Sequence, residues 1–523
     1  MGLYINIGNS GFRDTRNGEY VDKSGLIGVV NKTLQTKLRF SCVTRARRFG
    51  KSMAAEMLCA YYDCSCDSRE LFSDLAIARD PSFEKHLNKY PVVYIDMSSF
   101  IDRINSNDIV KLIQTRLRQD ILEAYPQVNV HDNDDLMDVM GRIAEQTGQQ
   151  FILIIDEWDA ICRDAAPATM DAYVSWLRRM FKSIDASRVF AAVYMTGILP
   201  IKKYNTQSAL NNFTEYSMIE PRRMAPYFGF TEKEVKELAQ RYGMDFAELE
   251  KWYDGYQIGD EMSMFNPNSV MQAIDAGRCR DYWAKTGAYD AVATYIRMNF
   301  EGLKDDIIRM LAGGRVKVRT SRFNNDIREV RSRDDVLTLL IHLGYLSFDW
   351  NRDECYIPNR EVADEMVNAV EENRWDYVVR SLLASEQLLD ALLRGEADTV
   401  ARGVEAAHDE STSVLSYNDE NSMACVLSLA FYYARNDYHI HREYATGKGF
   451  ADLVLIPRKN VTKPAVIIEL KYDHTVGTAL DQIRQRHYPQ KVAEYTGDML
   501  LVGISYDRQT KQHSCQIEHI TIG

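Results

Sequence analysis

Three residues near the C-terminal end of the chain, Asp452, Glu469 and Lys471, have the types and spacing that phosphodiester cleavage requires. Glu469 and Lys471 flank Leu470 in the apolar run VIIELKY, so the two-residue period of a strand places them on one face. Two carboxylates can hold Mg²⁺, which polarises a phosphodiester and lowers the pKa of a bound water. A lysine beside them can orient that water and offset charge in the transition state. An exposed ion-pair face is the alternative interpretation.

The Glu-x-Lys tripeptide alone says little, because a second copy, Glu234–Lys236, lies in a polar helical stretch. The C-terminal copy differs in its surroundings. Residues 411–523 predict a helix (MACVLSLAFYYAR), a strand pair (HIHREY and ADLVLIP), the strand PAVIIELKY, a helix at 476–495, and the strands DMLLVGISY and HSCQIEHIT. The first six of these elements follow the α-β-β-β-α-β order of the PD-(D/E)XK nuclease core, whose motif the three residues resemble.

Gly50, Lys51 and Ser52 form a second chemical motif, between the apolar-leaning run LRFSCVT and a helix predicted over MAAEMLCAYY. In loops of the pattern GxxxxGK[ST], backbone N–H groups and the helix N-terminus cradle phosphates. The lysine reaches the β and γ oxygens, and the hydroxyl binds Mg²⁺. Arg45 stands where the pattern has its first glycine, so the tripeptide alone is weak evidence.

Asp156 and Glu157 strengthen the prediction of a nucleotide site, because they end the apolar run FILII. ATP hydrolysis uses one carboxylate to hold Mg²⁺ and another to polarise the attacking water. Open α/β sheets bind ligands at the carboxyl ends of their strands, where this pair is expected. A solvated strand end is the alternative, and we interpret Asp96 in VVYID that way, since no second acid follows it.

Buried-strand candidates alternate with helical segments through residues 38–197, which predicts a parallel sheet covered on both faces. These candidates are LRFSCVT, PVVYIDMSS, FILIIDEWDA and VFAAVYMTG. From about 228 to 410 the pattern is mostly helical, and Asp334–Phe348 followed by ECYIPN resembles the helix and wing of a winged-helix fold. The expected fold class is α/β, with a P-loop NTPase domain (1–225), a helical, winged-helix-like middle domain (226–410) and a restriction-endonuclease-like α/β domain (411–523).

The composition is that of a folded protein. The 523 residues are 46% hydrophobic and 26% charged, with 12 prolines and 28 glycines, which excludes disordered and collagen-like classes. The N-terminus lacks a signal-peptide pattern, no apolar run reaches the length of a bilayer span, and the nine cysteines form no framework. These features predict a cytoplasmic protein without membrane contact. The net charge of −12 still leaves room for a local basic cleft.

A longer set of motifs occurs in order along the chain: VDKSGLI, TRARRFGKS, IIDEWDAI, YMTGILPI, ALNNF, FGFTEKEV, WYDGY, FNPNS and YWAKTG. With them the chain resembles the bacterial AAA-ATPase-like family whose members carry a C-terminal PD-(D/E)XK nuclease domain. The similarity covers essentially the whole chain. That family's phosphate loop reads Arg-Pro-Arg-Arg-Phe-Gly-Lys, so its missing first glycine is normal, and Ala46 replaces the proline here. The resemblance implies ATP and Mg²⁺ as cofactors.

By this resemblance, Ser52 and Asp156 would hold Mg²⁺ and Glu157 would be the catalytic base. Thr196 stands where related ATPases sense the γ-phosphate, and a plain strand-end threonine is an equally good interpretation. The residues expected to bind the nucleotide are Arg47, Arg48, Phe49, Gly50, Lys51, Ser52, Asp156 and Thr196. An arginine could neutralise transition-state charge. The candidates are Arg45, Arg47, Arg48, Arg222 and Arg223, and each also has an ordinary surface or ion-pair interpretation.

For the C-terminal site, the resemblance implies that Asp452 and Glu469 are the metal ligands. It adds Glu420 as an extra carboxylate of the metal shell, and Gln482 as a group that orients water or phosphate. The residues expected to act in catalysis are Asp452, Glu469, Lys471, Glu420 and Gln482, with Glu443 and Tyr488 as further members of the set.

Two weaker signals lie elsewhere. Residues 315–333 hold seven basic and two acidic side chains, which either contact phosphates or, since RVKVR alternates, are merely solvated. WYDGY at 252–256 predicts aromatic packing around a glycine turn.

The expected function is that of an ATPase coupled to a metal-dependent nuclease domain. ATP binding or hydrolysis would reposition the middle region and so control the access of nucleic acid, DNA in preference to RNA, to the C-terminal site. A nucleotide-dependent switch that binds DNA or a protein with little nuclease activity is the alternative. A plain ATPase whose C-terminal domain recognises protein is a third hypothesis, and a homo-oligomer is compatible with each.

Overall fold

The computed structural model describes the chain except for residues 1, 104–108, 202, 205–206, 209, 260–262, 284–293, 299, 327, 373–375, 412–425, 429, 446–449, 459–460, 474, 486–497, 508, 511 and 522–523. It divides into two compact units. Unit 1 comprises Met1–Lys285 and Lys317–Val362, and unit 2 comprises Thr286–Val316 and Ala363–Gly523. The expected middle region, 226–410, therefore contributes residues to both units.

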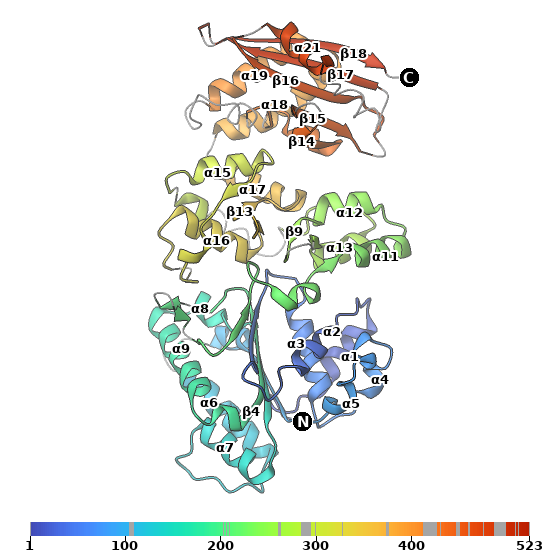
Figure 1. The fold of residues 1–523 in the computed structure, drawn as a ribbon. Helices are drawn as coiled ribbons and strands as arrows, with labels where there is room; N and C mark the ends of the chain where they lie inside the picture. The colour runs from blue at the N-terminus through green and yellow to red at the C-terminus, as the bar shows by residue number, and fades with distance from the viewer. Residues whose placement is uncertain are drawn as a thin grey trace. The chain divides into compact units, whose positions relative to one another are not determined.

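Unit 1 contains the predicted parallel sheet, with strands in the order β2-β3-β4-β1-β7 (Figure 1). The strands are β1 (Phe40–Thr44), β2 (Val92–Asp96), β3 (Phe151–Asp156), β4 (Phe190–Gly197) and β7 (Thr214–Tyr216), and every neighbouring pair is parallel. The first four coincide with the apolar runs predicted as strands. This sheet and the predicted fold class are confirmed, and the carboxyl ends of β1, β3 and β4 lie at one edge.

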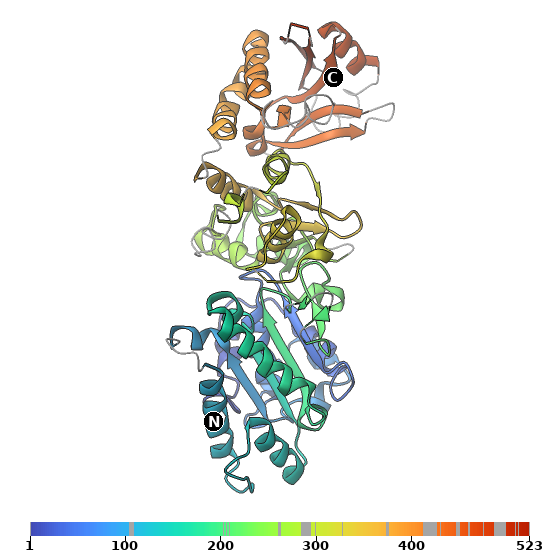
Figure 2. The same cartoon turned by 90° about the vertical axis from the view of Figure 1, so that its left-hand side faces the viewer.

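Helices cover both faces of this sheet (Figures 1 and 2). One face carries α1 (Ser10–Asn17), α2 (Gly25–Asn31) and α3 (Lys51–Tyr62), and the other carries α6 (Ile109–Ala124), α7 (Leu136–Thr147) and α9 (Pro167–Lys182). Short elements join them: α4 (Arg69–Phe72), η1 (Ala76–Arg79), α5 (Phe83–His86), η2 (Met97–Arg103), α8 (Ala160–Asp164), α10 (Ala186–Val189), β5 (Lys203–Tyr204), β6 (Gln207–Ser208) and η3 (Arg222–Tyr227).

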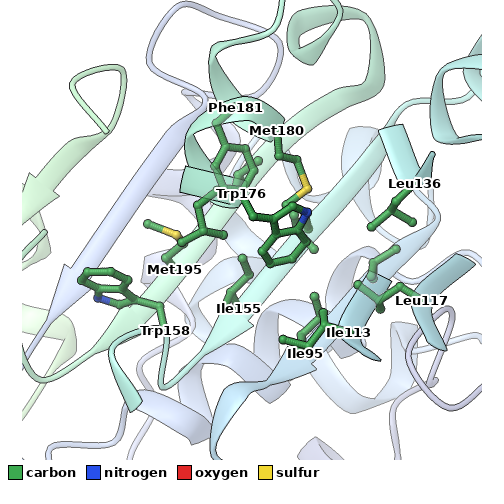
Figure 3. Packing of buried hydrophobic residues seen from close by; sticks show 14 of the residues in the cluster. Ile95, Ile113, Leu117, Leu136, Ile155, Trp158, Trp176, Met180, Phe181 and Met195 are labelled. Atoms are coloured by element: carbon green, nitrogen blue, oxygen red, sulfur yellow. The ribbon is translucent and has the colours of Figure 1, made fainter. Parts of the chain in front are cut away.

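Alternate residues of each strand enter two separate hydrophobic clusters. In β3, Leu153 and Ile155 pack with α6, α7 and α9, whereas Ile152 and Ile154 pack with α3. Figure 3 shows the first cluster, in which Trp176 of α9 lies near Ile155. Because both faces are buried, the strands read as continuous apolar runs and not as alternating ones.

The rest of unit 1 is largely helical. It contains β8 (Phe230–Thr231), α11 (Glu232–Tyr242), α12 (Phe246–Tyr253), β9 (Tyr256–Gln257), β10 (Ser263–Phe265), α13 (Pro267–Ala276), β11 (Val316–Lys317, which begins in unit 2), η5 (Thr320–Arg322), α16 (Arg333–Leu343), β12 (Ser347–Asp349) and β13 (Glu354–Tyr356). Thr231 and Glu234 form a reciprocal capping box that starts α11. The antiparallel hairpin β12–β13 follows α16, which is the predicted helix-and-wing arrangement.

Unit 2 contains a second five-stranded sheet, in the order β14-β15-β16-β17-β18. Only β16 and β17 are parallel, and α21 connects them. The elements are α15 (Leu303–Leu311), α17 (Arg360–Glu372, which begins in unit 1), α18 (Asp376–Leu393), α19 (Ala397–Ser411), η6 (Tyr432–Asn436), β14 (Tyr438–Ala445), β15 (Phe450–Pro457), β16 (Ala465–Tyr472), α21 (Val476–Gln485), β17 (Asp498–Tyr506) and β18 (His513–Thr521). Among the described residues, no helix is both long and apolar enough to cross a membrane.

Candidate nucleotide site and candidate nuclease site

The predicted phosphate loop joins β1 to α3. Gly50 precedes the helix with a left-handed φ of 85°, and no atom lies within 4 Å of the position that a Cβ would take, so the conformation and not the space requires glycine. Lys51 is only 5% exposed, and its Nζ donates to the carbonyl oxygen of Ala46 at 3.1 Å. The loop therefore curls around the lysine, as a loop that cradles phosphate at a helix N-terminus does.

The acid pair lies at the carboxyl end of β3, against this loop. The Ser52 side chain favours the charged form of the Asp156 carboxylate, and the Lys51 Nζ lies 3.9 Å from Oε1 of Glu157. Burial raises the pKa of both carboxyl groups and lowers the pKa of the lysine. The structure thus brings Lys51, Ser52, Asp156 and Glu157 together, with an arrangement suited to a triphosphate and its cation.

Arg163, which sequence reasoning missed, contacts Glu157, the expected catalytic base. Its Nη2 donates to Oε2 of Glu157 at 2.6 Å, and its Nε lies 3.2 Å from Oδ2 of Asp159. Glu157 has a left-handed φ of 49°, a conformation that is strained for a residue with a side chain. The spacing of Asp159 and Arg163, four residues apart in a helical stretch, is the signal that could have found this pair.

Asp159 also fixes the segment that follows β4. Its carboxylate accepts the backbone N–H groups of Ile198 (3.1 Å) and Leu199 (2.9 Å), while the Trp158 N–H donates to the carbonyl oxygen of Thr196 at 2.9 Å. Thr196 itself is fully buried, and no hydrogen-bond partner of its hydroxyl is found among the described residues. The acid pair and the expected sensor residue therefore belong to one hydrogen-bonded framework.

The WYDGY motif contacts the phosphate loop. The Tyr256 ring packs edge-on against Phe49, with centroids 5.1 Å apart, and its hydroxyl donates to the carbonyl oxygen of Gly344 at 2.9 Å. Gly344 in turn lies so close to the loop that a Cβ on it would be 2.5 Å from that of Ala46. Gly255 lies at the predicted glycine turn with a φ of 103°. Only glycine fits there, because a Cβ would be 2.0 Å from the Pro358 carbonyl oxygen. The predicted aromatic packing is confirmed, and Tyr256 couples the helical part of unit 1 to the phosphate loop.

The arginines of the loop differ in placement. Arg45 is fully buried, donates to the carbonyl oxygens of Thr44 and Tyr216, and stacks on Phe228, so its contacts are structural. Burial lowers its pKa to about 10. Arg47 is exposed, and Arg48 is half-buried with a left-handed φ of 68°. Elsewhere in unit 1, Arg222 pairs with Glu220, and Arg223 donates to the Tyr216 hydroxyl.

The second site lies on β15, β16 and α21 of unit 2. Since Leu453 lies opposite Ile468, Asp452 comes opposite Glu469, and facing residues of antiparallel strands share one face. The Lys471 Nζ donates to Oε1 of Glu469 at 3.1 Å, and the Leu470 N–H donates to Oδ2 of Asp452 at 2.7 Å. The structure brings Asp452, Glu469 and Lys471 together, as their spacing predicts.

Gln482 joins this set from α21, since its Nε2 also donates to Oε1 of Glu469. Gly503 of β17 allows the helix to approach, because a Cβ there would lie 2.8 Å from the Val476 carbonyl oxygen and 3.2 Å from the Ala479 Cβ. Glu469 is only 1% exposed. A buried carboxylate contacted by an ammonium and an amide is consistent with a role beyond that of a surface ion pair.

Other predicted members of the site lie outside the described residues. These are Glu420 and Tyr488, and the Glu443 side chain is likewise not described, although its backbone lies in β14. Within the described part of the chain, no group of three His, Cys, Asp or Glu residues could hold a metal. Asp452 and Glu469 supply two hard oxygen donors, which fit Mg²⁺ because that ion usually keeps several waters.

Comparison with known proteins finds two family models. Residues 6–206 match the model described as predicted AAA-ATPase, and residues 418–515 match the model of the PD-(D/E)XK nuclease superfamily. An uncharacterized protein in the vnfD 5′ region of Azotobacter chroococcum mcd 1 is 25% identical over 293 residues, which make up 54% of this chain and 54% of that protein. The chain thus spans about half the length of the curated relative it matches.

Three solved structures are also similar. A Walker-type ATPase of Pyrococcus abyssi has a TM-score of 0.30 and 15% identity, and covers 66% of this chain and 94% of its own. Cdc6p from Pyrobaculum aerophilum has a TM-score of 0.25 and 11% identity, and covers 67% of this chain and 93% of its own. The Aeropyrum pernix ORC2 protein, in ADPNP–ADP complexes, has a TM-score of 0.27 and 10% identity, and covers 68% of this chain and 96% of its own. The two family models and the two sheets agree with the architecture expected from the motifs: the chain combines an AAA-ATPase-like domain with a domain of the PD-(D/E)XK nuclease superfamily.

Proposed function

We propose that the chain hydrolyses ATP in unit 1 and cleaves nucleic-acid phosphodiester bonds, with a divalent cation, in unit 2. The observation that carries the nuclease assignment is the buried Glu469 carboxylate, which lies opposite Asp452 and is contacted by Lys471 and Gln482. DNA is proposed as the substrate in preference to RNA.

In unit 1, Lys51 would leave the Ala46 carbonyl and bind the β and γ oxygens of the triphosphate. Ser52 and Asp156 would hold Mg²⁺, which neutralises charge on those oxygens. Glu157 would accept a hydrogen bond from the attacking water, and its carboxylate is kept in place by Arg163. When Lys51 moves to the phosphates, Glu157 would keep its contact with Arg163, and its other oxygen would be open to the water.

In unit 2, Asp452 and Glu469 would hold a Mg²⁺ or Mn²⁺ ion, which supplies a polarised phosphate and a water of lowered pKa. Lys471 would orient that water and offset negative charge on the phosphorane-like transition state. Gln482 would keep Glu469 directed at the metal, since its amide donates to the same oxygen as Lys471.

A panel of labelled substrates tests this proposal. Single- and double-stranded DNA and RNA are incubated with the full chain, with and without ATP and with Mg²⁺, Mn²⁺ or EDTA. The expected result is metal-dependent cleavage that Asp452→Asn removes and Asp507→Asn, an exposed aspartate beyond β17, leaves unchanged. Cleavage that survives in Asp452→Asn, or in EDTA, would contradict the nuclease assignment.

A second candidate function is a nucleotide-dependent switch with little nuclease activity. The contact of Tyr256 and Gly344 with the phosphate loop favours it, because nucleotide binding there would be transmitted to the helical part of unit 1. DNA affinity that changes with ADP or ATP, in the absence of any metal-dependent cleavage, would distinguish the switch from the nuclease.

A further inference from the structure

A basic segment is fixed along the β12–β13 hairpin of unit 1. The Lys317 Nζ donates to the Arg352 carbonyl oxygen at 2.8 Å, and the Val318 N–H donates to that of Asp353 at 3.0 Å. Beyond η5, the Phe323 ring stacks on His342 of α16, with centroids 6.4 Å apart. The segment is therefore held on both the hairpin and the helix, so the backbone that carries its arginines is fixed.

Three arginines of this surface have no acidic partner among the residues that the structure describes. Arg319, Arg322 and Arg352 are all exposed, and we call them the arginine strip. Neighbouring cations are engaged within the molecule, since Lys317 pairs with Glu354 at 3.8 Å and Arg331 with Glu329 at 3.9 Å. A planar guanidinium that is not used internally is suited to bidentate contact with phosphate oxygens.

An exposed tryptophan lies in the same turn as Arg352 of the strip. Trp350 occupies the turn between β12 and β13 and is 54% exposed, an unusual position for a side chain with so much apolar surface. Its neighbour in sequence but one is Arg352, whose backbone N–H is tied to the Asp349 carbonyl oxygen at 3.2 Å. An indole ring can stack on a nucleobase only where that base is unpaired, and such stacking accompanies cationic grooves in proteins that bind single strands.

We propose that the arginine strip and Trp350 form a binding surface for a nucleic-acid strand with unpaired bases. The arginines contact phosphates of the strand, and the indole stacks on one of its bases. Arginines alone would suit any anion, whereas the adjacent aromatic ring selects a polyanion that carries flat bases. The inference rests on the proposed nuclease function in one respect: the bound strand is taken to be its substrate.

Fluorescence anisotropy of a labelled oligothymidine, measured with the full chain in EDTA so that no cleavage occurs, tests the surface. The variant Arg319→Gln/Arg322→Gln removes two phosphate contacts, so the slope of log affinity against log salt should fall by about 1.4, since each contact to a single strand contributes about 0.7. Trp350→Ala should weaken binding by about tenfold or more through the lost stacking.

A matched control removes the same charge elsewhere. Arg188→Gln/Lys233→Gln changes two exposed side chains on α10 and α11, at 69% and 86% exposure, and should bind as the wild type does. If the control and the strip variant lose affinity equally, only net charge matters and the strip is no binding surface. Duplex DNA that binds as tightly as the single strand, with no effect of Trp350→Ala, would overturn the role of unpaired bases.

Cleavage assays separate this inference from the nuclease proposal. If cleavage depends on Asp452 but the strip variant keeps the wild-type KM, the proposed binding surface is wrong and the nuclease proposal stands. If binding depends on the strip but no substrate is cleaved, the binding surface is supported and the nuclease proposal is wrong. Far-UV circular dichroism and the thermal midpoint, which exposed substitutions should not change, show that each variant is folded.

Discussion

The two candidate sites assemble their carboxylates in different ways. In unit 2, Asp452 and Glu469 face each other across two paired strands, and Gln482 reaches them from the next helix, so one short segment builds the site. In unit 1, the acid pair meets a loop that lies about a hundred residues earlier, and Tyr256 covers that loop from the helical region. The first site depends on local register, whereas the second depends on the relative position of several segments.

The cations around the acids differ as well. Glu157 is contacted by Lys51 on one oxygen and by Arg163 on the other, so one cation can leave while the other keeps the carboxylate in place. Glu469 receives Lys471 and Gln482 on the same oxygen, Oε1. We therefore expect the site of unit 1 to exchange partners when a nucleotide binds, and the site of unit 2 to be the preassembled one.

The largest effect is expected at the preassembled site. Glu469→Ala should lower metal-dependent cleavage by about a thousandfold, on the order of 4 kcal/mol in the barrier, because it removes a metal ligand. ATP turnover should stay at the wild-type rate, since no described residue of the nucleotide site lies in unit 2. Glu518→Ala, on β18 of the same unit, is the control. A parallel loss of ATP turnover in Glu469→Ala would break the comparison between the two sites.

A smaller effect is expected when Arg163, the cation that stays on Glu157, is removed. Arg163→Gln should lower kcat for ATP by about 10- to 100-fold, since a hydrogen bond between charged groups contributes about 1.5–3 kcal/mol. KM should change little, because Arg163 contacts the base and not the phosphate loop. Steady-state ATP turnover measures both constants. A rise in KM with kcat unchanged would show that Arg163 serves binding and does not position Glu157.

The buried Glu361 of unit 1 should make stability depend on pH. Its carboxylate accepts hydrogen bonds from the Ser269 hydroxyl and the Tyr282 N–H, and burial raises its pKa to about 7. Because the folded pKa lies above the ordinary 4.5, its contribution to stability is complete below pH 4.5 and is lost as pH rises through 7. Glu361→Gln should therefore raise the thermal midpoint at pH 8 by a few degrees and flatten its fall between pH 5 and 8.

Scanning calorimetry at several pH values measures this effect. Glu237→Gln, an exposed change on α11, is the control and should keep the wild-type profile. A Glu361→Gln profile parallel to that of the wild type would show that the pH dependence arises elsewhere.

The smallest effect is expected at the contact between Tyr256 and the phosphate loop. Tyr256→Phe removes the hydrogen bond to the Gly344 carbonyl but keeps the ring against Phe49, so it should cost about 1 kcal/mol of stability. Tyr256→Ala also removes the aromatic contact and should weaken the effect of ATP on cleavage. Cleavage rates with and without ATP measure the coupling. Equal stimulation by ATP in Tyr256→Ala and the wild type would show that this contact does not connect the sites.

Much of the sheet in unit 1 could be predicted from the sequence, because long apolar runs such as FILIID fill strands that are buried on both faces. The fifth strand, β7, has only three residues and a half-exposed start, so its pattern gives no signal. In unit 2, the strand period was enough to place Glu469 and Lys471 on one face, and their contact confirms it.

The rest of the site depends on tertiary contacts. Glu157 has a left-handed φ where the chain turns into α8, and Arg163 of that helix contacts the Glu157 carboxylate. The spacing of the two residues alone does not predict this turn. Tyr256 meets Phe49 across about two hundred residues of chain, which no local pattern encodes. Arg45 was expected near phosphates, yet it is buried, donates to the Tyr216 carbonyl oxygen at the end of β7 and lies over the Phe228 ring.

The most direct test of the account counts divalent cations. Mn²⁺ binding to the full chain is measured by electron paramagnetic resonance, with and without the ATP analogue ADPNP, in the wild type, Glu469→Ala and Lys51→Ala. The account predicts a site present without nucleotide that only Glu469→Ala removes, and a further site, formed with ADPNP, that only Lys51→Ala removes. A single site, or a loss of both in either variant, would contradict two independent cation sites on one chain.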